Sequence, residues 1–265
     1  LVTNVRTTGK SFREIPWLVR ELPVTTLPSM HMVKRTEKSP GTVRSYDNFI
    51  GFGYGRMGRD GGGLASLAAN TSRSGNVLLN YDEVSNLEPL PSTIQELRSI
   101  SNMFGSDRSR VFLEQQSTEE QLKLSNLSNF DVIEFATHAV EVHINDTVQG
   151  PALVLAEVDR QSPQQDGLLT SREIEKLRLD SPLIILSACD TAATSDVGRQ
   201  PYSGLASAFL FAGAESVVAT HWPVESVSSA RIVTGMFRHL RDDEERSIAE
   251  ALRLSMVELA DSTTE

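Results

Sequence analysis

The sequence predicts an α/β fold with a mostly parallel central sheet. The first sign is a set of short apolar runs, such as 130–136 and 183–186, rich in Ile, Leu, Val and Phe. Runs of this kind, flanked by helical sequence, are typical of buried strands in parallel sheets. The second sign is their order, since helix and strand patterns alternate between residues 92 and 138. Parallel strands joined by crossover helices produce this alternation.

Composition and charge narrow the possible functions. The chain has 265 residues, enough for one large or two small domains. Its net charge of −10 argues against nucleic acid as a partner of this domain, because phosphate binding needs a basic patch. The same charge favours basic substrates through electrostatic steering. The single cysteine, Cys189, excludes an internal disulfide and fits a cytoplasmic location.

Neither a membrane span nor a signal peptide is expected. No apolar run approaches the roughly 20 residues that a bilayer requires. Residues 1–20 carry charges and lack a continuous apolar segment. Because the first residue is Leu1 and not Met, we expect the chain to be part of a longer protein or a processed product.

We expect a strand-rich N-terminal subregion over about residues 1–60. β-branched residues and prolines in 13–30 fit one or two edge strands, and a further strand over 48–54 runs into glycines. The glycines of 51–55 superficially resemble a phosphate loop, but no Gly-Lys-Ser/Thr ending follows, which disfavours nucleotide binding. A flexible loop is expected over 59–80.

The main part of the fold is expected over about residues 88–262. Its first helix is predicted to be capped by Ser92 and to carry an apolar stripe. A short strand at 111–113 and a helix beginning at Thr118 lead into a strand at 131–138.

A loop over 141–149 and a strand or hairpin arm at 151–156 are expected next. The later elements, in chain order, are a helix capped by Thr170, the strand that leads to Cys189, an exposed loop over 193–202, a helix from Ser203 to Gly213, a strand over 214–221, and helices over about 225–240 and 245–260. We expect all of these elements to form a single domain that spans residues 1–265.

Two of the predicted strands end near residues that can act together in catalysis. The strand at 131–138 ends at His138, and the run 183–186 leads to Cys189. In a parallel sheet both ends lie at the same edge, so imidazole and thiol are expected side by side. A neighbouring imidazole is what an activated cysteine nucleophile requires. Taken alone, a cysteine at a strand end is more often a buried apolar residue.

Five motifs follow one another along the chain. They are 135–138 (Phe-Ala-Thr-His), 151–155 (Pro-Ala-Leu-Val-Leu), 186–192 (Leu-Ser-Ala-Cys-Asp-Thr-Ala), 204–214 and 216–224. Together they resemble the CHAT family, whose members are caspase-like cysteine peptidases related to caspases and separase. The resemblance extends from about Trp17 to near the C-terminus. It implies a caspase-like three-layer sandwich, with helices on both faces of the sheet, and hydrolysis of peptide bonds.

The resemblance implies a catalytic dyad of His138 and Cys189. The two lie 51 positions apart, close to the His-to-Cys spacing of about 50 residues in caspases. Cys189 would attack the scissile carbonyl as a thiolate while His138 transfers the proton. The backbone N–H groups of Cys189 and Ala139 would bind the oxyanion. Ala139 stands where the family usually has Gly, and it costs on the order of 1 kcal/mol if that position needs a positive φ.

Other residues are weaker candidates for a catalytic role beside His138 and Cys189. Glu134 lies on the same strand as His138 but about 13 Å along it, too far to orient the imidazole. Asn145 and Asp146, in the loop that follows, are expected to be solvated. His221 is the only rival base, and we interpret it as a pocket-wall residue. No metal-ligand spacing and no Gly-x-Ser-x-Gly motif occurs in the sequence, and no cofactor is implied.

Substrate selection is predicted to favour a basic residue before the scissile bond. Ser187, Asp190 and Glu225 are the expected substrate-binding residues, and no Arg or Lys lies next to Cys189 or in the turn 222–225. A pocket for an acidic side chain would need a cation there, whereas carboxylates would pair with Arg or Lys. Alternatively, Glu225 only begins the next helix, where an acidic residue suits the helix dipole.

The resemblance also implies partners and regulation. The substrate would be a protein or peptide, relatives often follow helical repeats or a sensor domain, and several act in prokaryotic defence. The loop 193–202 is expected to be mobile and to shape the cleft, with Arg199 a candidate cleavage site. The alternative function is a caspase-like interaction or scaffold module without turnover, which Ala139 favours.

Overall fold

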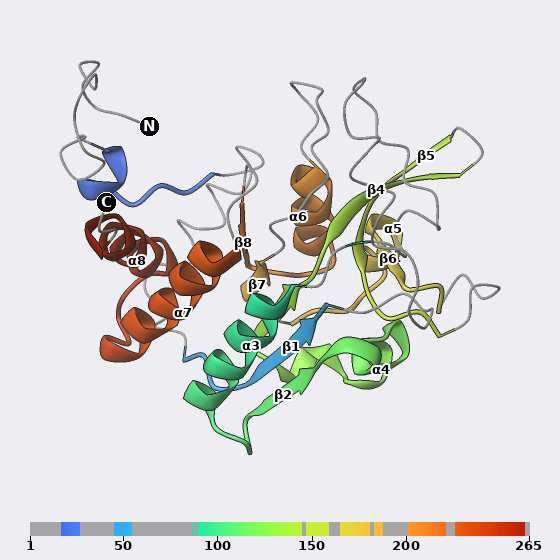
Figure 1. Ribbon diagram of the computed structural model, residues 1–265, viewed down its shortest axis with the longest axis horizontal. Coiled ribbons are helices and arrows are strands. Elements are labelled where there is room, and N and C mark those ends of the chain that lie inside the picture. The colour runs from blue at the N-terminus through green and yellow to red at the C-terminus, as the bar shows by residue number, and fades with distance from the viewer. Residues whose placement is uncertain are drawn as a thin grey trace. The chain divides into compact units, whose positions relative to one another are not determined.

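The computed structural model describes residues 17–26, 45–54, 87, 90–144, 147–158, 165–180, 183–187, 201–220 and 226–262 (Figure 1). Several predicted site residues lie outside the described residues, namely Asn145, Asp146, Cys189, Asp190, Arg199, His221 and Glu225. The predicted loop at 59–80 and most of the predicted loop at 193–202 also lie outside them. The chain forms two compact units, a larger one of residues 46–226 and a smaller one of residues 1–45 and 227–265.

A five-stranded sheet forms the centre of the larger unit. The strands are β1 (Phe49–Gly53), β2 (Ser109–Phe112), β3 (Val132–Ala136), β7 (Leu183–Leu186) and β8 (Ser216–Ala219). Their order is β2-β1-β3-β7-β8, and every pairing is parallel. This arrangement confirms the predicted α/β fold. Because the strands are parallel, their carboxyl ends all lie at one edge of the sheet, which we call the carboxyl edge.

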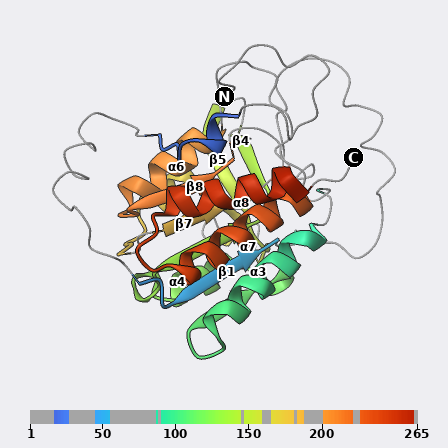
Figure 2. The same ribbon diagram turned by 90° about the vertical axis from the view of Figure 1, so that its left-hand side faces the viewer.

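Helices cover both faces of this sheet, as the resemblance implied. The helices are α3 (Pro91–Phe104), α4 (Glu119–Leu124), α5 (Ser171–Ile174) and α6 (Pro201–Phe211). Side chains alternate along β3, so Ile133 and Phe135 point to one face and Glu134 to the other. The first face packs with α4, α5 and α6 in one apolar core, and α3 covers the second face. Figure 2 shows α3 running alongside β1.

Two glycines of β1 allow α3 to lie close to the sheet. A Cβ atom at Gly51 would come within 2.5 Å of the Cδ2 atom of Leu97, a fully buried residue of α3. A Cβ atom at Gly53 would lie 2.7 Å from the Cδ2 atom of Leu113. The glycines that superficially resemble a phosphate loop therefore make room for a packed helix.

A small antiparallel sheet follows His138, where the sequence was expected to form a loop. Its strands are β4 (Ala139–Ile144), β5 (Thr147–Val154) and β6 (Leu168–Thr170), in that order. The expected loop over 141–149 is therefore wrong, and the strand expected at 151–156 is confirmed as part of β5. Apolar residues at 140, 142 and 144 alternate with polar ones, which is the period of a strand.

The cap predicted at Thr170 and the helix start predicted at Thr118 are confirmed. Thr170 forms a capping box at the start of α5, and the Thr118 hydroxyl accepts the N–H of Gln121 at 3.1 Å. The cap predicted at Ser92 and the helix start predicted at Ser203 are wrong, because α3 and α6 begin at Pro91 and Pro201, one and two residues earlier. Proline is preorganised for the first helical turn, so it moves the start of the helix toward the N-terminus.

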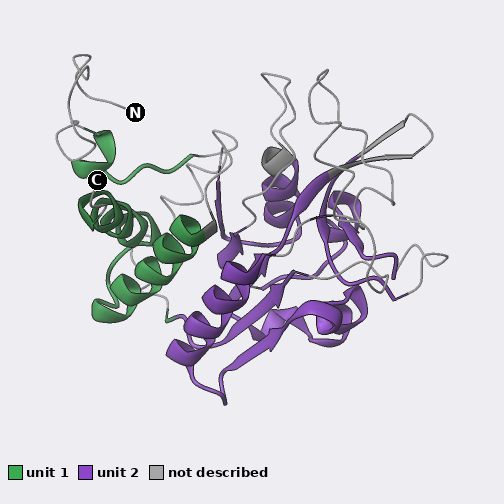
Figure 3. Ribbon diagram, in the orientation of Figure 1, with its two compact units in different colours: residues 1–45, 227–265 green, residues 46–226 purple. Residues whose placement is uncertain are grey.

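The smaller unit contains η2 (Leu18–Arg20), α7 (Ser226–Asp242) and α8 (Ile248–Ser262) (Figure 3). The two predicted C-terminal helices are thereby confirmed. The strands expected over 13–30 are wrong across 17–26, where Leu18–Arg20 form a 3-10 turn. The guanidinium of Arg253 in α8 donates to the carbonyl oxygens of Val19 and Arg20, at 3.4 and 3.0 Å. Backbone groups that a strand would pair are thus bonded to a helix side chain.

Candidate active site

Three polar or aromatic residues follow the central strands at the carboxyl edge. Tyr54 comes directly after β1, His138 follows β3 and Ser187 follows β7. The N–H of Ser187 donates to the carbonyl oxygen of Phe135 at 3.0 Å, so the pairing of β3 and β7 continues one residue beyond β7. The first four residues of β3 each pair with the β7 residue 51 positions later, as Phe135 does with Leu186.

His138 is held from two sides. Its ring meets the ring of Tyr54 edge to face, with the centroids 5.2 Å apart and the planes at 80°. The Tyr54 hydroxyl donates in turn to the carbonyl oxygen of Leu87 at 3.0 Å. The carbonyl oxygen of His138 accepts the N–H of Val154 in β5 at 2.9 Å. The residue is only 1% exposed, so ring packing and backbone bonding both restrict the imidazole.

Ala139 begins β4 and needs no left-handed backbone. Among the residues that the structure describes, only Glu114 and Asn126 combine a side chain with a positive φ. The conformational cost considered for Ala139 in place of Gly therefore does not arise. Because Val154 donates to His138, the next pair, Ala139 with Leu153, is of the non-hydrogen-bonded type, and the N–H of Ala139 points away from β5.

Beneath the carboxyl edge lies a buried group that we call the carboxyl cluster, formed by Glu96, Glu134 and Ser187. The three residues come from α3, β3 and the end of β7, and none is more than 2% exposed. The Ser187 hydroxyl donates to the Oε2 atom of Glu96 at 2.9 Å. A substrate would have to replace this hydrogen bond in order to use the Ser187 hydroxyl.

The two carboxyl groups of the cluster both have raised pKa values. Burial raises the pKa of Glu96 to about 7, although hydrogen bonds from Glu134 and Ser187 oppose the shift. Burial and then the nearby charge of Glu96 raise the pKa of Glu134 well above its usual range. Within the described part of the chain, neither Glu134 oxygen meets an N–H or hydroxyl donor. Burial therefore favours the protonated form of both carboxyl groups.

The structure brings some predicted site residues together and adds new ones. His138, Ala139 and Ser187 lie at the same edge of the sheet, while Cys189, Asp190 and Glu225 are outside the described residues. The sequence analysis did not identify Tyr54 or Glu96 as residues of the site. A carboxylate within an apolar pattern could have indicated the buried cluster. Glu96 shares a helix face with buried residues, and Glu134 stands mid-strand between apolar neighbours.

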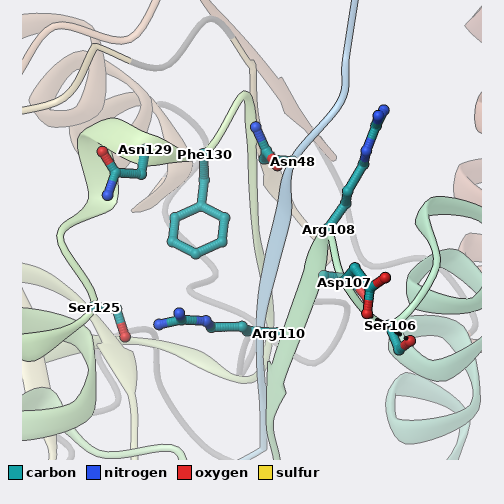
Figure 4. Close-up of a pocket in the computed structure, with 9 residues that line it drawn as sticks. Asn48, Ser106, Asp107, Arg108, Arg110, Ser125, Asn129 and Phe130 are labelled. Carbon is teal, nitrogen blue, oxygen red and sulfur yellow. Dashed lines mark hydrogen bonds between the residues drawn. The ribbon is translucent and has the colours of Figure 1, made fainter.

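A separate polar pocket lies at the opposite edge of the sheet. It has a volume of about 330 Å³ and includes Asn48, Arg108 and Phe130, which lie one or two residues before β1, β2 and β3. The guanidinium of Arg110 lies over the ring of Phe130, 5.9 Å from its centroid (Figure 4). Because parallel strands point away from this edge, the pocket is not part of the site around His138.

In the described ranges of the chain, no three side chains of the His, Cys, Asp or Glu type are grouped so as to hold a metal ion. None of the helices described has the length and apolar character needed to cross a bilayer.

The fold and the edge that carries His138 define an α/β protein of the caspase-like class. Residues 8–265 match the family model of the CHAT domain. The chain therefore belongs to the CHAT family, which is related to caspase-like peptidases. No curated protein matches the chain.

Proposed function

We propose that the chain is a cysteine endopeptidase in which Cys189 is the nucleophile and His138 the general base. The register of the central sheet is the observation that carries this proposal. β3 and β7 pair with a constant offset of 51 positions, and Cys189 follows His138 by the same 51 positions in the sequence. Residues related by the register of two parallel strands are neighbours across the sheet, so this match supports a thiol beside the imidazole.

The reaction follows from these two groups. The Cys189 thiolate attacks the carbonyl carbon, and the carbonyl electron pair moves onto oxygen, which the N–H groups of Ala139 and Cys189 bind. The direction of the Ala139 N–H, away from β5, supports its part in this step. His138 then protonates the leaving amine as the C–N bond breaks. A water molecule that His138 deprotonates hydrolyses the thioester and releases the acid and the thiol.

The proposal extends to substrates, location and context. We assign selectivity for Arg or Lys before the scissile bond to the carboxylates of Asp190 and Glu225, with Ser187 close to the same strand end. The substrate is a protein or peptide in the cytoplasm. A helical-repeat or sensor domain in a longer protein would control the activity, in a prokaryotic defence or regulated cell-death system.

The alternative function, a scaffold without turnover, was favoured by Ala139. That argument depended on a strained backbone, and Ala139 has no positive φ. The strain argument for the alternative therefore does not apply, and the endopeptidase is the function that we propose.

Peptide hydrolysis by wild type, Cys189→Ala and His138→Ala tests this proposal. We expect both variants to lose turnover by about two orders of magnitude or more, because each removes one reacting group. Thermal melts of the same samples check that the fold is intact. Turnover near the wild-type rate in folded Cys189→Ala would reject the endopeptidase assignment.

A further inference from the structure

Burial of the carboxyl cluster costs folding free energy. Two carboxyl groups and a hydroxyl are buried between α3 and the sheet, at positions where apolar residues usually pack. Replacing buried ionisable pairs by apolar residues of similar shape is often neutral or stabilising. Stability alone therefore does not account for the cluster. Clusters of buried ionisable groups are instead common at functional sites.

The cluster joins the two strands that lead to the proposed dyad. Ser187 lies two residues before Cys189, and Glu134 lies four residues before His138. Glu96 contacts the end of β7 from α3, because its Oε2 atom accepts the Ser187 hydroxyl at 2.9 Å. Glu134, in the middle of β3, lies close enough to Glu96 for each carboxyl group to shift the pKa of the other.

We propose that Glu96 is a positioning residue for the proposed nucleophile. Through its hydrogen bond to Ser187, Glu96 fixes the end of β7, two residues before Cys189 in the sequence. This inference rests on the proposed function. A misplacement of about 1 Å between reacting groups reduces rates by about 10²-fold, so a single buried hydrogen bond near the nucleophile has a measurable effect.

Few other charges face Glu96 among the described residues. The strands that pack against α3 are β1, β2 and β3. β1 consists of Phe, Ile and Gly residues, and the one ionisable residue of β2 is Arg110, which is exposed beside Phe130 at the opposite edge of the sheet. β3 contributes Glu134 alone. The charge state of Glu96 is therefore set mainly by Glu134 and by burial.

The test measures alkylation of Cys189 by iodoacetamide between pH 6.5 and 10, together with kcat and KM for a peptide. Glu96→Gln and Ser187→Ala should alkylate about tenfold more slowly than wild type at pH 6.5, because a displaced thiol loses the imidazolium that lowers its pKa. The rates should converge near pH 10, where the thiol is ionised in all variants. We expect kcat to fall by a similar factor with little change in KM.

The direction in which the alkylation rate changes in Glu96→Gln distinguishes a loss of positioning from the removal of a charge. Loss of a nearby carboxylate would by itself favour the thiolate and speed alkylation at pH 6.5. Slower alkylation therefore requires a change of position. Glu134→Gln leaves the hydrogen bond between Ser187 and Glu96 in place and should stay within about threefold of wild type.

Glu119→Gln is the matched control. Glu119 is another buried glutamate whose pKa is raised to about 7, mainly by burial, but it bonds to Lys123 and to the N–H of Gly167. Its replacement should leave the alkylation rate unchanged.

If folded Glu96→Gln and Ser187→Ala both alkylate at or above the wild-type rate, the positioning role of Glu96 is overturned, while the proposed endopeptidase function is not affected. If wild-type Cys189 is no faster than a free thiol and does not depend on His138, the proposed function fails and this inference fails with it.

Discussion

At the scale of single residues, the carboxyl pair links protonation to stability. Glu134 is completely buried, and the pKa values of Glu134 and Glu96 both lie above their usual value of 4.5. A carboxyl group whose pKa is higher in the folded than in the unfolded protein binds more protons when folded. Its stabilising contribution is complete below about pH 4.5 and is lost as the pH rises through the folded value.

Glu134→Gln should therefore become more stable relative to wild type as the pH increases. The amide cannot ionise, so the difference in unfolding free energy should grow from pH 4.5 upward, by at most about 1.4 kcal/mol per pH unit. Glu119, whose pKa is also about 7, is present in both proteins, so its contribution cancels in the difference between their unfolding free energies. Denaturant unfolding of both proteins from pH 4.5 to 9 measures the difference. A constant difference across this range would show that Glu134 does not titrate with a raised pKa.

At the scale of elements, the turn between α6 and β8 depends on a glycine. Gly213 has a φ of +115°, and a Cβ atom there would lie 2.3 Å from the carbonyl oxygen of Leu179. The N–H of Leu179 donates to the carbonyl oxygen of Ala212 at 3.0 Å, so the two backbones are bonded at this point. Gly105, which ends α3, has a φ of +85° but open space around its Cα atom.

Alanine at these two glycines separates conformational strain from steric clash. Gly105→Ala should cost about 1 kcal/mol of unfolding free energy, because an alanine is strained at positive φ. Gly213→Ala has the same strain and an added backbone clash, and should cost at least about 2 kcal/mol more. Chemical denaturation of both variants gives the comparison. Equal losses would mean that the close approach of Leu179 is not maintained in solution.

Prediction from sequence succeeded where strand and helix patterns are continuous. The apolar run of β7, the mostly apolar run of β3 and the long helices α7 and α8 were all predicted. β4 was missed because polar residues at 141 and 143 interrupt its apolar positions, although the alternation has the period of a strand. The strands expected near residue 20 were wrong because bonds from Arg253, far away in the sequence, fix a different backbone there.

The candidate site also has a part that the sequence predicts and a part that only the folded structure reveals. The place of His138 at a strand end and its spacing from Cys189 are properties of the sequence. The contact of Glu96 with Ser187 joins residues 91 positions apart, and the burial of Glu134 depends on α3 lying close to β1. Such contacts arise only from the packed fold, so no local pattern could predict them.

At the scale of the whole molecule, the net charge of −10 bears on substrate choice. A peptide panel that differs only in the residue before the cut should show higher kcat/KM for Arg and Lys than for Asp. Because the attraction is partly long-range, kcat/KM for the Arg peptide should also fall as salt rises. Glu225→Gln should reduce the preference for Arg. A preference for Asp would reject the basic pocket, and an unchanged preference for Arg in Glu225→Gln would assign the role to Asp190.

The central claim is that His138 activates Cys189. The most direct measurement is mass spectrometry of the chain after brief exposure to a peptidyl electrophile that ends in arginine, with iodoacetamide as the reference reagent. We predict an adduct on Cys189 that forms faster than alkylation by iodoacetamide, and that slows by about 10²-fold in folded His138→Ala. Labelling at the same rate in wild type and His138→Ala would contradict the dyad.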